Sequence, residues 1–185
     1  NRVELYGGIG NDRYYIYDPA LDRVHETAGQ GFDVVETDSA SLDASSGAGY
    51  GQNIELLRLL GASVLDLTGG GSVVQLEGNA GANRLTGLAN AEQIFGGAGN
   101  DMLDGGAGND VYRVWSVEDV VNEYANSGID LIRTTMPNTD PPLDSPAAIA
   151  YQYLQAKHAG MARVFPMGTI TRGRAGQVLA ELGLL

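Results

Sequence analysis

A nine-residue repeat constrains this chain more than any other feature. The hexapeptide GGAGND occurs at residues 96–101 and again at 105–110, and counting back in nines gives six consecutive blocks over residues 60–113. The eighth position of every block is a large apolar residue, and these residues are Leu67, Leu76, Leu85, Ile94, Leu103 and Tyr112. A fixed apolar position at this period argues against a flexible glycine-rich linker and predicts a stack of similar structural units.

Each block predicts one turn followed by one short strand. Six glycine-rich positions favour a turn, because glycine tolerates positive φ and crowded backbone. The last three residues place one apolar side chain on the inner face of a strand, since strand side chains alternate between the two faces. Two blocks would form a coil of about eighteen residues, and coils must stack as parallel strands to bury the apolar position. The predicted fold class is therefore mainly β, a parallel β-solenoid.

The sixth position of the blocks predicts where a metal ion binds. In chain order it is occupied by Leu65, Val74, Asn83, Glu92, Asp101 and Asp110. Ca²⁺ takes six to eight oxygen ligands, from carboxylates and backbone carbonyls, and a single turn cannot supply them. Stacked turns on the same side of the roll can supply them together. The blocks at 60–77 are predicted to be metal-free coils held by apolar packing.

Blocks that are two apart in the sequence lie on the same side of the predicted stack. Asp101 is therefore expected to face Asn83 on one neighbouring coil and Asp119 on the other. By the same spacing, Asp110 is expected to face Glu92 and Asp130.

A longer repeat surrounds the nonapeptide array. Residues 6–37 align with residues 104–134, and the alignment pairs Asp12, Asp22 and Asp33 with Asp110, Asp119 and Asp130. Each long unit is predicted to contain a nonapeptide turn, a looser pair of strands and a second turn that leads into a β-rich strand.

Three blocks carry a resemblance to a known family. GGIGNDRYY (7–15), GGAGNDMLD (96–104) and GGAGNDVYR (105–113) resemble the haemolysin-type calcium-binding nonapeptide of RTX proteins, GGxGxDxUx, in which U is a large apolar residue. The resemblance covers about residues 1–135. It implies a right-handed parallel β-roll with several Ca²⁺ ions in its turns. It also implies secretion from a Gram-negative bacterium by type I export, although no export signal is recognised in the sequence.

The candidate calcium ligands combine the turn glycines with the side chains at and near the sixth position. They are Gly8, Gly10, Asp12, Asp33, Asn83, Glu92, Gly97, Gly99, Asp101, Gly106, Gly108, Asp110, Asp119 and Asp130. Some of the acidic residues could instead be turn-forming or solvated side chains. A phosphate-binding loop is disfavoured, because GGAGND has no lysine nearby and leads into another turn rather than a helix.

Composition restricts the partners further. The formal net charge of −12 argues against nucleic acid and anionic membranes and is compatible with a divalent cation. The sequence has no run of eighteen apolar residues, so no membrane span is predicted, and the absence of cysteine excludes a thiolate metal site. Trp115 and the Tyr14–Tyr17 cluster are expected to cover the flank of the roll, or alternatively to contact a glycan.

Residues 136–185 differ in character and are predicted to form a separate α/β tail. Ser145-Pro146 starts a predicted helix at 147–159, residues 162–170 read as a strand, and 175–185 as a second helix. MPNTDPPLDSP (136–146) and RVFPMGTITRGRAGQVLAELGLL (163–185) resemble part of dihydroorotase, a metal-dependent amidohydrolase on a (β/α)₈ barrel. The resemblance implies a substrate contact for Asn138.

No catalysis is expected from this tail. RTX-like sequence stands where the dihydroorotase family carries its HxH metal motif, and a barrel needs about 250 residues. His25 and His158 are isolated and are not expected to bind metal. The tail is either a fused fragment or the result of an artificial join near Thr134–Met136.

The sequence leads to one preferred function and two alternatives. The preferred function is a calcium-binding structural module of a secreted or surface RTX protein, such as a toxin or adhesin, which is not an enzyme. The alternatives are an inactive dihydroorotase-like fragment in a fused chain, and an adhesin segment that binds a glycan or a protein on a cell surface.

Overall fold

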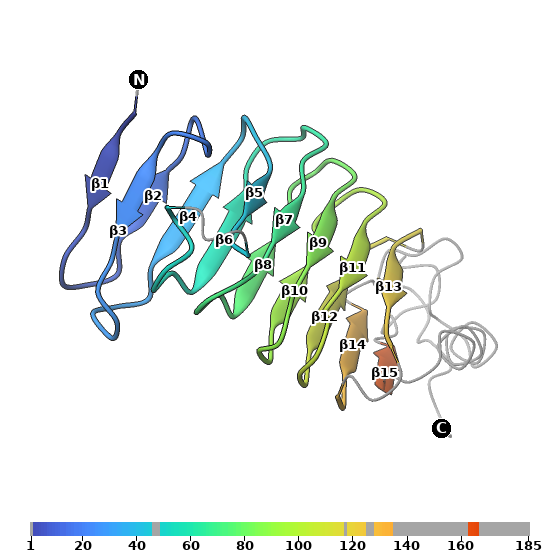
Figure 1. Cartoon of the computed structure of the whole chain (residues 1–185). Coiled ribbons are helices and arrows are strands. Elements are labelled where there is room, and N and C mark those ends of the chain that lie inside the picture. The colour runs from blue at the N-terminus through green and yellow to red at the C-terminus, as the bar shows by residue number, and fades with distance from the viewer. Residues whose placement is uncertain (1, 46–48, 117, 125–127, 135–162, 167–185) are drawn as a thin grey trace, which may run out of the picture.

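Every regular element among the described residues is a β-strand. The structure is a computed structural model, shown in Figure 1, and it describes residues 2–45, 49–116, 118–124, 128–134 and 163–166. The strands are β1 (Glu4–Tyr6), β2 (Arg13–Tyr15), β3 (Arg23–His25), β4 (Val34–Thr37), β5 (Leu42–Asp43), β6 (Leu56–Leu59), β7 (Leu67–Thr68), β8 (Gln75–Glu77), β9 (Arg84–Thr86), β10 (Gln93–Phe95), β11 (Met102–Asp104), β12 (Val111–Val114), β13 (Val120–Asn122), β14 (Leu131–Thr134) and β15 (Arg163–Pro166).

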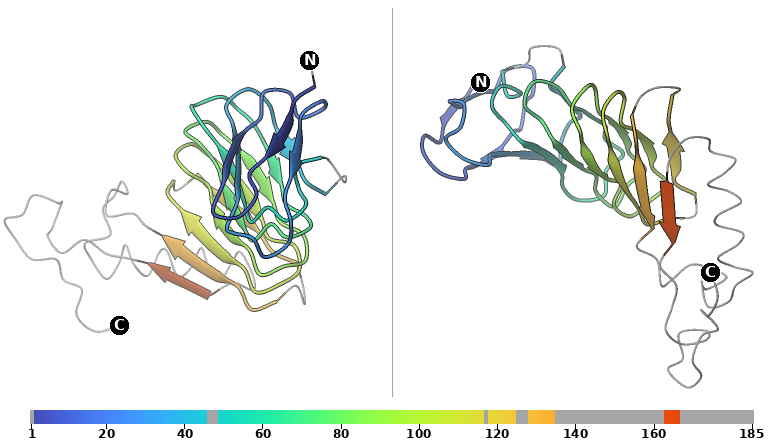
Figure 2. Two further views of the ribbon diagram at one scale, coloured as in Figure 1. Left: turned by 90° about the vertical axis from the view of Figure 1, so that its left-hand side faces the viewer. Right: turned by 90° about the horizontal axis from the view of Figure 1, so that it is seen from below.

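The strands alternate between two walls of a parallel β-solenoid. One sheet has the order β15-β14-β12-β10-β8-β6-β4-β2, the second has the order β13-β11-β9-β7-β5, and β1 and β3 form a separate pair. All pairings are parallel. Figure 2 shows the coils following one another along the stack. The predicted fold class is therefore confirmed.

The apolar eighth position forms the core between the two walls. Leu85 lies beside Leu67 and Leu103, and Ile94 lies beside Leu76, so each residue packs on its equivalent one coil away. The side chains at all six eighth positions are fully buried. Burying an apolar side chain of this size contributes about 1.5–3 kcal/mol, so the column is the main apolar support of a narrow core.

The long repeats widen the coil without breaking the stack. Backbone-to-side-chain hydrogen bonds link residues 18 apart in the middle of the array, 21 apart at Asp12–Asp33 and 20 apart at Asp110–Asp130. The extra residues lie between the strands, and the strands on both sides keep their parallel register.

The aromatic residues predicted for the flank divide into two groups. Tyr14 lies in the core, because it occupies the eighth position of the block at 7–15, so its prediction as a flank residue is wrong. Tyr17 and Trp115 are exposed on the surface.

One strand comes from the segment predicted to form a separate tail. β15 pairs in parallel with β14, where Arg163 is opposite Leu131 and Pro166 is opposite Thr134. The strand predicted within 162–170 is therefore present, and it extends the eight-stranded sheet of the roll. The helices predicted at 147–159 and 175–185 lie outside the described residues.

Candidate metal centre

A first column of acidic side chains follows the turns that lead into the eight-stranded sheet. The backbone N–H of Glu92 donates to Asp110 Oδ1 at 2.8 Å, and the N–H of Asp110 donates to Asp130 Oδ1 at 2.8 Å. All three side chains are buried. Asp110 therefore lies between Glu92 and Asp130, as the spacing of the blocks predicts.

A second column follows the turns on the other side of the coil. The N–H of Asn83 donates to Asp101 Oδ1 at 2.9 Å, and the N–H of Asp101 donates to Asp119 Oδ1 at 2.9 Å. The side-chain amide of Asn83 donates to the carbonyl of Leu65, 2.7 Å away. This column therefore ends at an apolar residue, where no carboxylate is available.

The N-terminal coils repeat the first pattern. The N–H of Asp12 donates to Asp33 Oδ1 at 2.9 Å, and the N–H of Asp33 donates to Glu55 Oε2 at 2.8 Å. Glu55 is not among the predicted ligands, because NIELLRL at 53–59 lies outside the nine-residue register. The stack itself shows that Glu55 occupies the position equivalent to Asp33 one coil further along.

Several carboxylates in these columns keep one oxygen without a protein partner. Buried oxygens with no hydrogen bond among the described residues include Asp12 Oδ2, Glu92 Oε2, Asp101 Oδ2, Asp110 Oδ2 and Asp130 Oδ2. A buried, unpaired carboxylate oxygen is costly, and folded proteins satisfy such atoms or use them as ligands. Cations bound at the separate turns would satisfy these oxygens.

Asp119 differs from the other carboxylates. Its Oδ1 accepts from Asp101, and its Oδ2 accepts from the backbone N–H groups of Trp115 and Ser116, both at 2.9 Å. Asp22 is the equivalent residue of the first long repeat, and hydrogen bonds from its own turn, led by that of Asp18, hold its pKa below the ordinary value. Both residues shape a turn, and the calcium role of Asp119 stays a prediction.

Backbone oxygens lie next to the unpartnered carboxylates. A Cβ added at Gly87 would lie 2.5 Å from the carbonyl oxygen of Gly105 and 3.0 Å from Glu92 Oε2, so oxygens from two coils converge there. The turn glycines predicted as ligands all adopt positive φ, namely Gly8, Gly10, Gly97, Gly99, Gly106 and Gly108. This mixture of carbonyl and carboxylate oxygens matches the ligands of Ca²⁺.

Burial makes these acids hard to ionise in the metal-free chain. Desolvation and, to a lesser extent, the neighbouring carboxylate of Asp110 together raise the pKa of Glu92 to about 7. Desolvation also raises the pKa of Asp101 to about 6, and the pKa of Asp110 is raised for the same reason. A divalent cation would reverse this effect, because an adjacent positive charge favours the ionised form.

These pKa values predict a pH dependence of calcium affinity. Folded Glu92 and Asp101 bind protons more tightly than they do in the unfolded chain, so these two groups contribute stability to the metal-free roll that is fully present below about pH 4. That stability is lost as the pH rises through about 6 and 7. Ca²⁺ must displace the same protons, so its affinity is expected to rise over this range. Calorimetric Ca²⁺ titration at several pH values across this range measures the affinity. An affinity that does not change with pH would contradict the assignment of these carboxylates as calcium ligands.

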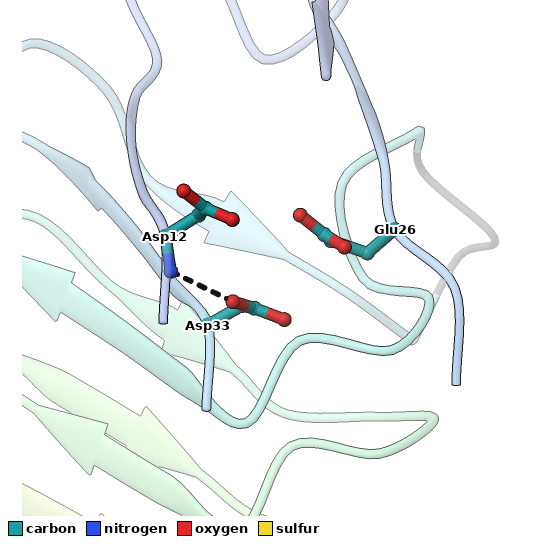
Figure 3. Close-up of side chains that lie close together, drawn as sticks. All are labelled: Asp12, Glu26 and Asp33. Carbon is teal, nitrogen blue, oxygen red and sulfur yellow. Dashed lines mark hydrogen bonds between the residues drawn. The ribbon is translucent and has the colours of Figure 1, made fainter. Parts of the chain in front are cut away.

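Two clusters of three carboxylates were not predicted from the sequence. Asp12, Glu26 and Asp33 each place an oxygen within 4.8 Å of the others, and Figure 3 shows Glu26 facing the stacked aspartates. Asp110, Glu123 and Asp130 form the equivalent cluster in the second long repeat. The alignment of residues 6–37 with 104–134 also pairs Glu26 with Glu123, which was the signal that could have identified them.

The remaining predicted residues lie away from these columns. His25 contacts Glu4 at 2.6 Å and stacks on Tyr6, on an exposed part of the surface. Asn138 and His158 lie outside the described residues, so the substrate contact implied for Asn138 stays a prediction.

Comparison with known proteins identifies the repeats. The RTX calcium-binding nonapeptide repeat family matches residues 77–112 with its four copies. The match includes the turns of Asn83, Glu92, Asp101 and Asp110 and begins where the blocks with apolar sixth positions end. It does not reach the block at 7–15, which nevertheless has the same pair of positive-φ glycines.

Curated relatives match this chain over short stretches only. Dihydroorotases from Aquifex aeolicus, Trichlorobacter lovleyi and Geobacter sulfurreducens are 46%, 50% and 48% identical to the chain over 46, 50 and 48 residues. These stretches make up 25%, 27% and 26% of this chain but only 11%, 12% and 11% of the respective relatives. The similarity to dihydroorotase is therefore that of a fragment.

No solved structure gives a significant match to the chain. Within the part of the chain that the structure describes, no helix is long and apolar enough to cross a membrane. The stacked parallel coils, the glycine turns and the family match together show that the chain contains RTX calcium-binding nonapeptide repeats folded as a β-roll.

Proposed function

We propose that this chain is a calcium-binding structural module of a secreted or cell-surface protein, and that its β-roll folds when Ca²⁺ enters the turns. The observation that carries the proposal is the set of buried carboxylate oxygens without protein partners, at turns where backbone carbonyls converge. Ca²⁺ prefers this set of hard oxygen ligands, and each ion would connect two coils.

The environment outside a cell suits such a module. Extracellular calcium modules bind with dissociation constants of about 10⁻⁴–10⁻³ M, which is far above the Ca²⁺ concentration of cytosol. A roll with this affinity would stay unfolded before export and fold after it. The RTX repeats support this order of events, since proteins with such repeats are typically secreted.

The proposed function is tested by calorimetric Ca²⁺ titration of the full chain and its Asp101→Asn variant. Asparagine keeps an oxygen that can accept the hydrogen bond from Asn83 but removes the charge. We expect Asp101→Asn to weaken or abolish at least one binding event. Asp66→Asn is the matched control, because exposed Asp66 also accepts a backbone hydrogen bond, from Arg84 at 3.0 Å. Equal isotherms for all three proteins would refute the assignment of Asp101.

A second proposal concerns the dihydroorotase-like segment. We propose that it contributes no dihydroorotase activity, because the matched stretches are only 11–12% of the length of the relatives. We also propose that the boundary between the roll and the tail lies near residue 135. A dihydroorotate hydrolysis assay of the full chain tests the proposed lack of activity, and turnover above the background rate would overturn it.

A further inference from the structure

We propose that each long repeat contains a calcium site of a second kind, an Asp–Glu–Asp triad that binds Ca²⁺ more tightly than the nonapeptide turns. The triads are Asp12–Glu26–Asp33 and Asp110–Glu123–Asp130. This inference rests on the proposed function, because it takes Ca²⁺ as the ion. It adds Glu26 and Glu123 as ligands, and it predicts that the triads bind Ca²⁺ before the nonapeptide turns do. The nonapeptide repeat alone implies neither point.

The triads arise where a nonapeptide turn stacks against a lengthened turn. Asp110 closes the nonapeptide turn at 105–110, while Glu123 directly follows β13 and Asp130 directly precedes β14. In five of the six nonapeptide blocks at 60–113 the first position is a glycine, such as Gly96 or Gly105. The lengthened turn therefore has a carboxylate where the ordinary turn has no side chain.

The unpartnered oxygen of each nonapeptide aspartate points toward the triad. A Cβ added at Gly105 would lie 2.2 Å from Asp110 Oδ2 and 2.3 Å from the hydroxyl oxygen of Tyr112, so these atoms share one small space. The Tyr112 hydroxyl donates a hydrogen bond to Glu123. Asp110 Oδ2 has no hydrogen-bond partner, and Asp110 and Asp130 are each only 1% exposed.

The N-terminal copy has the same arrangement. A Cβ at Gly7 would lie 2.1 Å from the Tyr14 hydroxyl and 2.4 Å from Asp12 Oδ2, which is also unpartnered. Tyr14 donates to Glu26 as Tyr112 donates to Glu123. The recurrence of the arrangement at both ends of the array is a second indication that it is a built site.

The tyrosine hydroxyls orient the glutamates. Tyr112 also accepts a hydrogen bond from the backbone N–H of Gly105 at 2.7 Å, so its hydroxyl is fixed between the turn and Glu123. A phenol is protonated at neutral pH, so the Tyr112 hydroxyl donates to Glu123 while it accepts from Gly105. An outer group that positions a ligand in this way commonly contributes 10- to 100-fold to metal affinity.

The size and charge of the triads fit Ca²⁺. Oxygens bound at 2.3–2.6 Å on opposite sides of one ion are about 5 Å apart, and the triad oxygens lie within 4.8 Å of one another. Three carboxylates give each triad more negative charge than the Asn83–Asp101 pair has. Calcium affinity increases with the charge of the ligands, so the triads are expected to load first.

The test compares calcium titrations of the full chain with those of Glu26→Gln, Glu123→Gln and the double variant. Glutamine keeps an acceptor for the tyrosine hydroxyl and removes one charge. We expect the double variant to lose the tighter class of sites, about two Ca²⁺ ions per chain, while the weaker class remains. Glu118→Gln is the matched control, since Glu118 is exposed in the same long repeat, and its isotherm should equal that of the wild type.

Tyr112→Phe gives an independent measurement if a glutamine variant fails to fold. It keeps the packed ring but removes the hydroxyl, and we expect Ca²⁺ binding at one tight site to weaken about 10- to 100-fold. Tb³⁺ bound in place of Ca²⁺ should also show emission sensitised by tyrosine, which falls in Glu26→Gln and Glu123→Gln. A wild-type chain that binds Ca²⁺ but matches the double variant in both assays would overturn the triads alone. A wild-type chain that binds no Ca²⁺ would overturn the proposed function as well.

Discussion

Removal of Ca²⁺ with excess chelator is expected to abolish most of the β-structure of residues 1–135. This segment has 20 acidic and 7 basic residues, so the metal-free chain repels itself. Its core is a narrow column of single apolar side chains, and buried carboxylate oxygens add an unfavourable desolvation term. Ca²⁺ supplies positive charge and connects neighbouring coils, so binding and folding should occur together.

Far-ultraviolet circular dichroism during a Ca²⁺ titration measures this change. The β signal should appear cooperatively, with a midpoint of roughly 10⁻⁴–10⁻³ M Ca²⁺. An equal concentration of Mg²⁺ is the control, because Mg²⁺ requires a smaller octahedral site and gives up its waters reluctantly. A full β signal in excess chelator would show that the apolar column is sufficient to fold the roll.

The second large effect is expected from a cavity in the core. Leu103→Ala removes a fully buried side chain that packs between Leu85 and Val121 of the neighbouring coils. Substitutions of this kind destabilise proteins by about 2–5 kcal/mol. Because folding and Ca²⁺ binding are linked, we expect the variant to need a higher Ca²⁺ concentration to reach half of its folded signal.

Met102→Ala is the matched control for this substitution. Met102 precedes Leu103 in β11, but its side chain points outward and is 38% exposed. Its truncation should change the calcium midpoint far less than that of Leu103, as measured by circular dichroism and by urea unfolding at saturating Ca²⁺. Similar effects of the two substitutions would contradict a core built on the eighth position.

The sequence predicts the middle of the roll well, because one period determines both strand and turn there. Counting in nines located the buried column from Leu67 to Tyr112 and the stacking of Asp101 between Asn83 and Asp119. The physical reason is that each block packs only on its equivalents one coil away.

The prediction is weaker where the period changes. Glu26 and Glu55 lie outside the nine-residue register, and Glu123 occupies the first block position, where Gly105 stands one coil earlier, so counting sixth positions could not place these glutamates beside the aspartates. Tyr14 was predicted on the flank because its cluster was considered as a group, although its block places it in the core. β15 shows another limit, since no local pattern indicates that residues 163–166 would join the sheet of the roll.

The central claim is that the turns of the roll bind Ca²⁺, and counting bound ions tests it most directly. Equilibrium dialysis of the full chain, followed by elemental analysis, gives the number of Ca²⁺ ions held per chain at about 1 mM free Ca²⁺, within the range of extracellular modules. We predict several ions on the wild-type chain and on Asp66→Asn, and fewer on Asp101→Asn. A wild-type chain that retains no Ca²⁺, or the same number on all three proteins, would contradict the account.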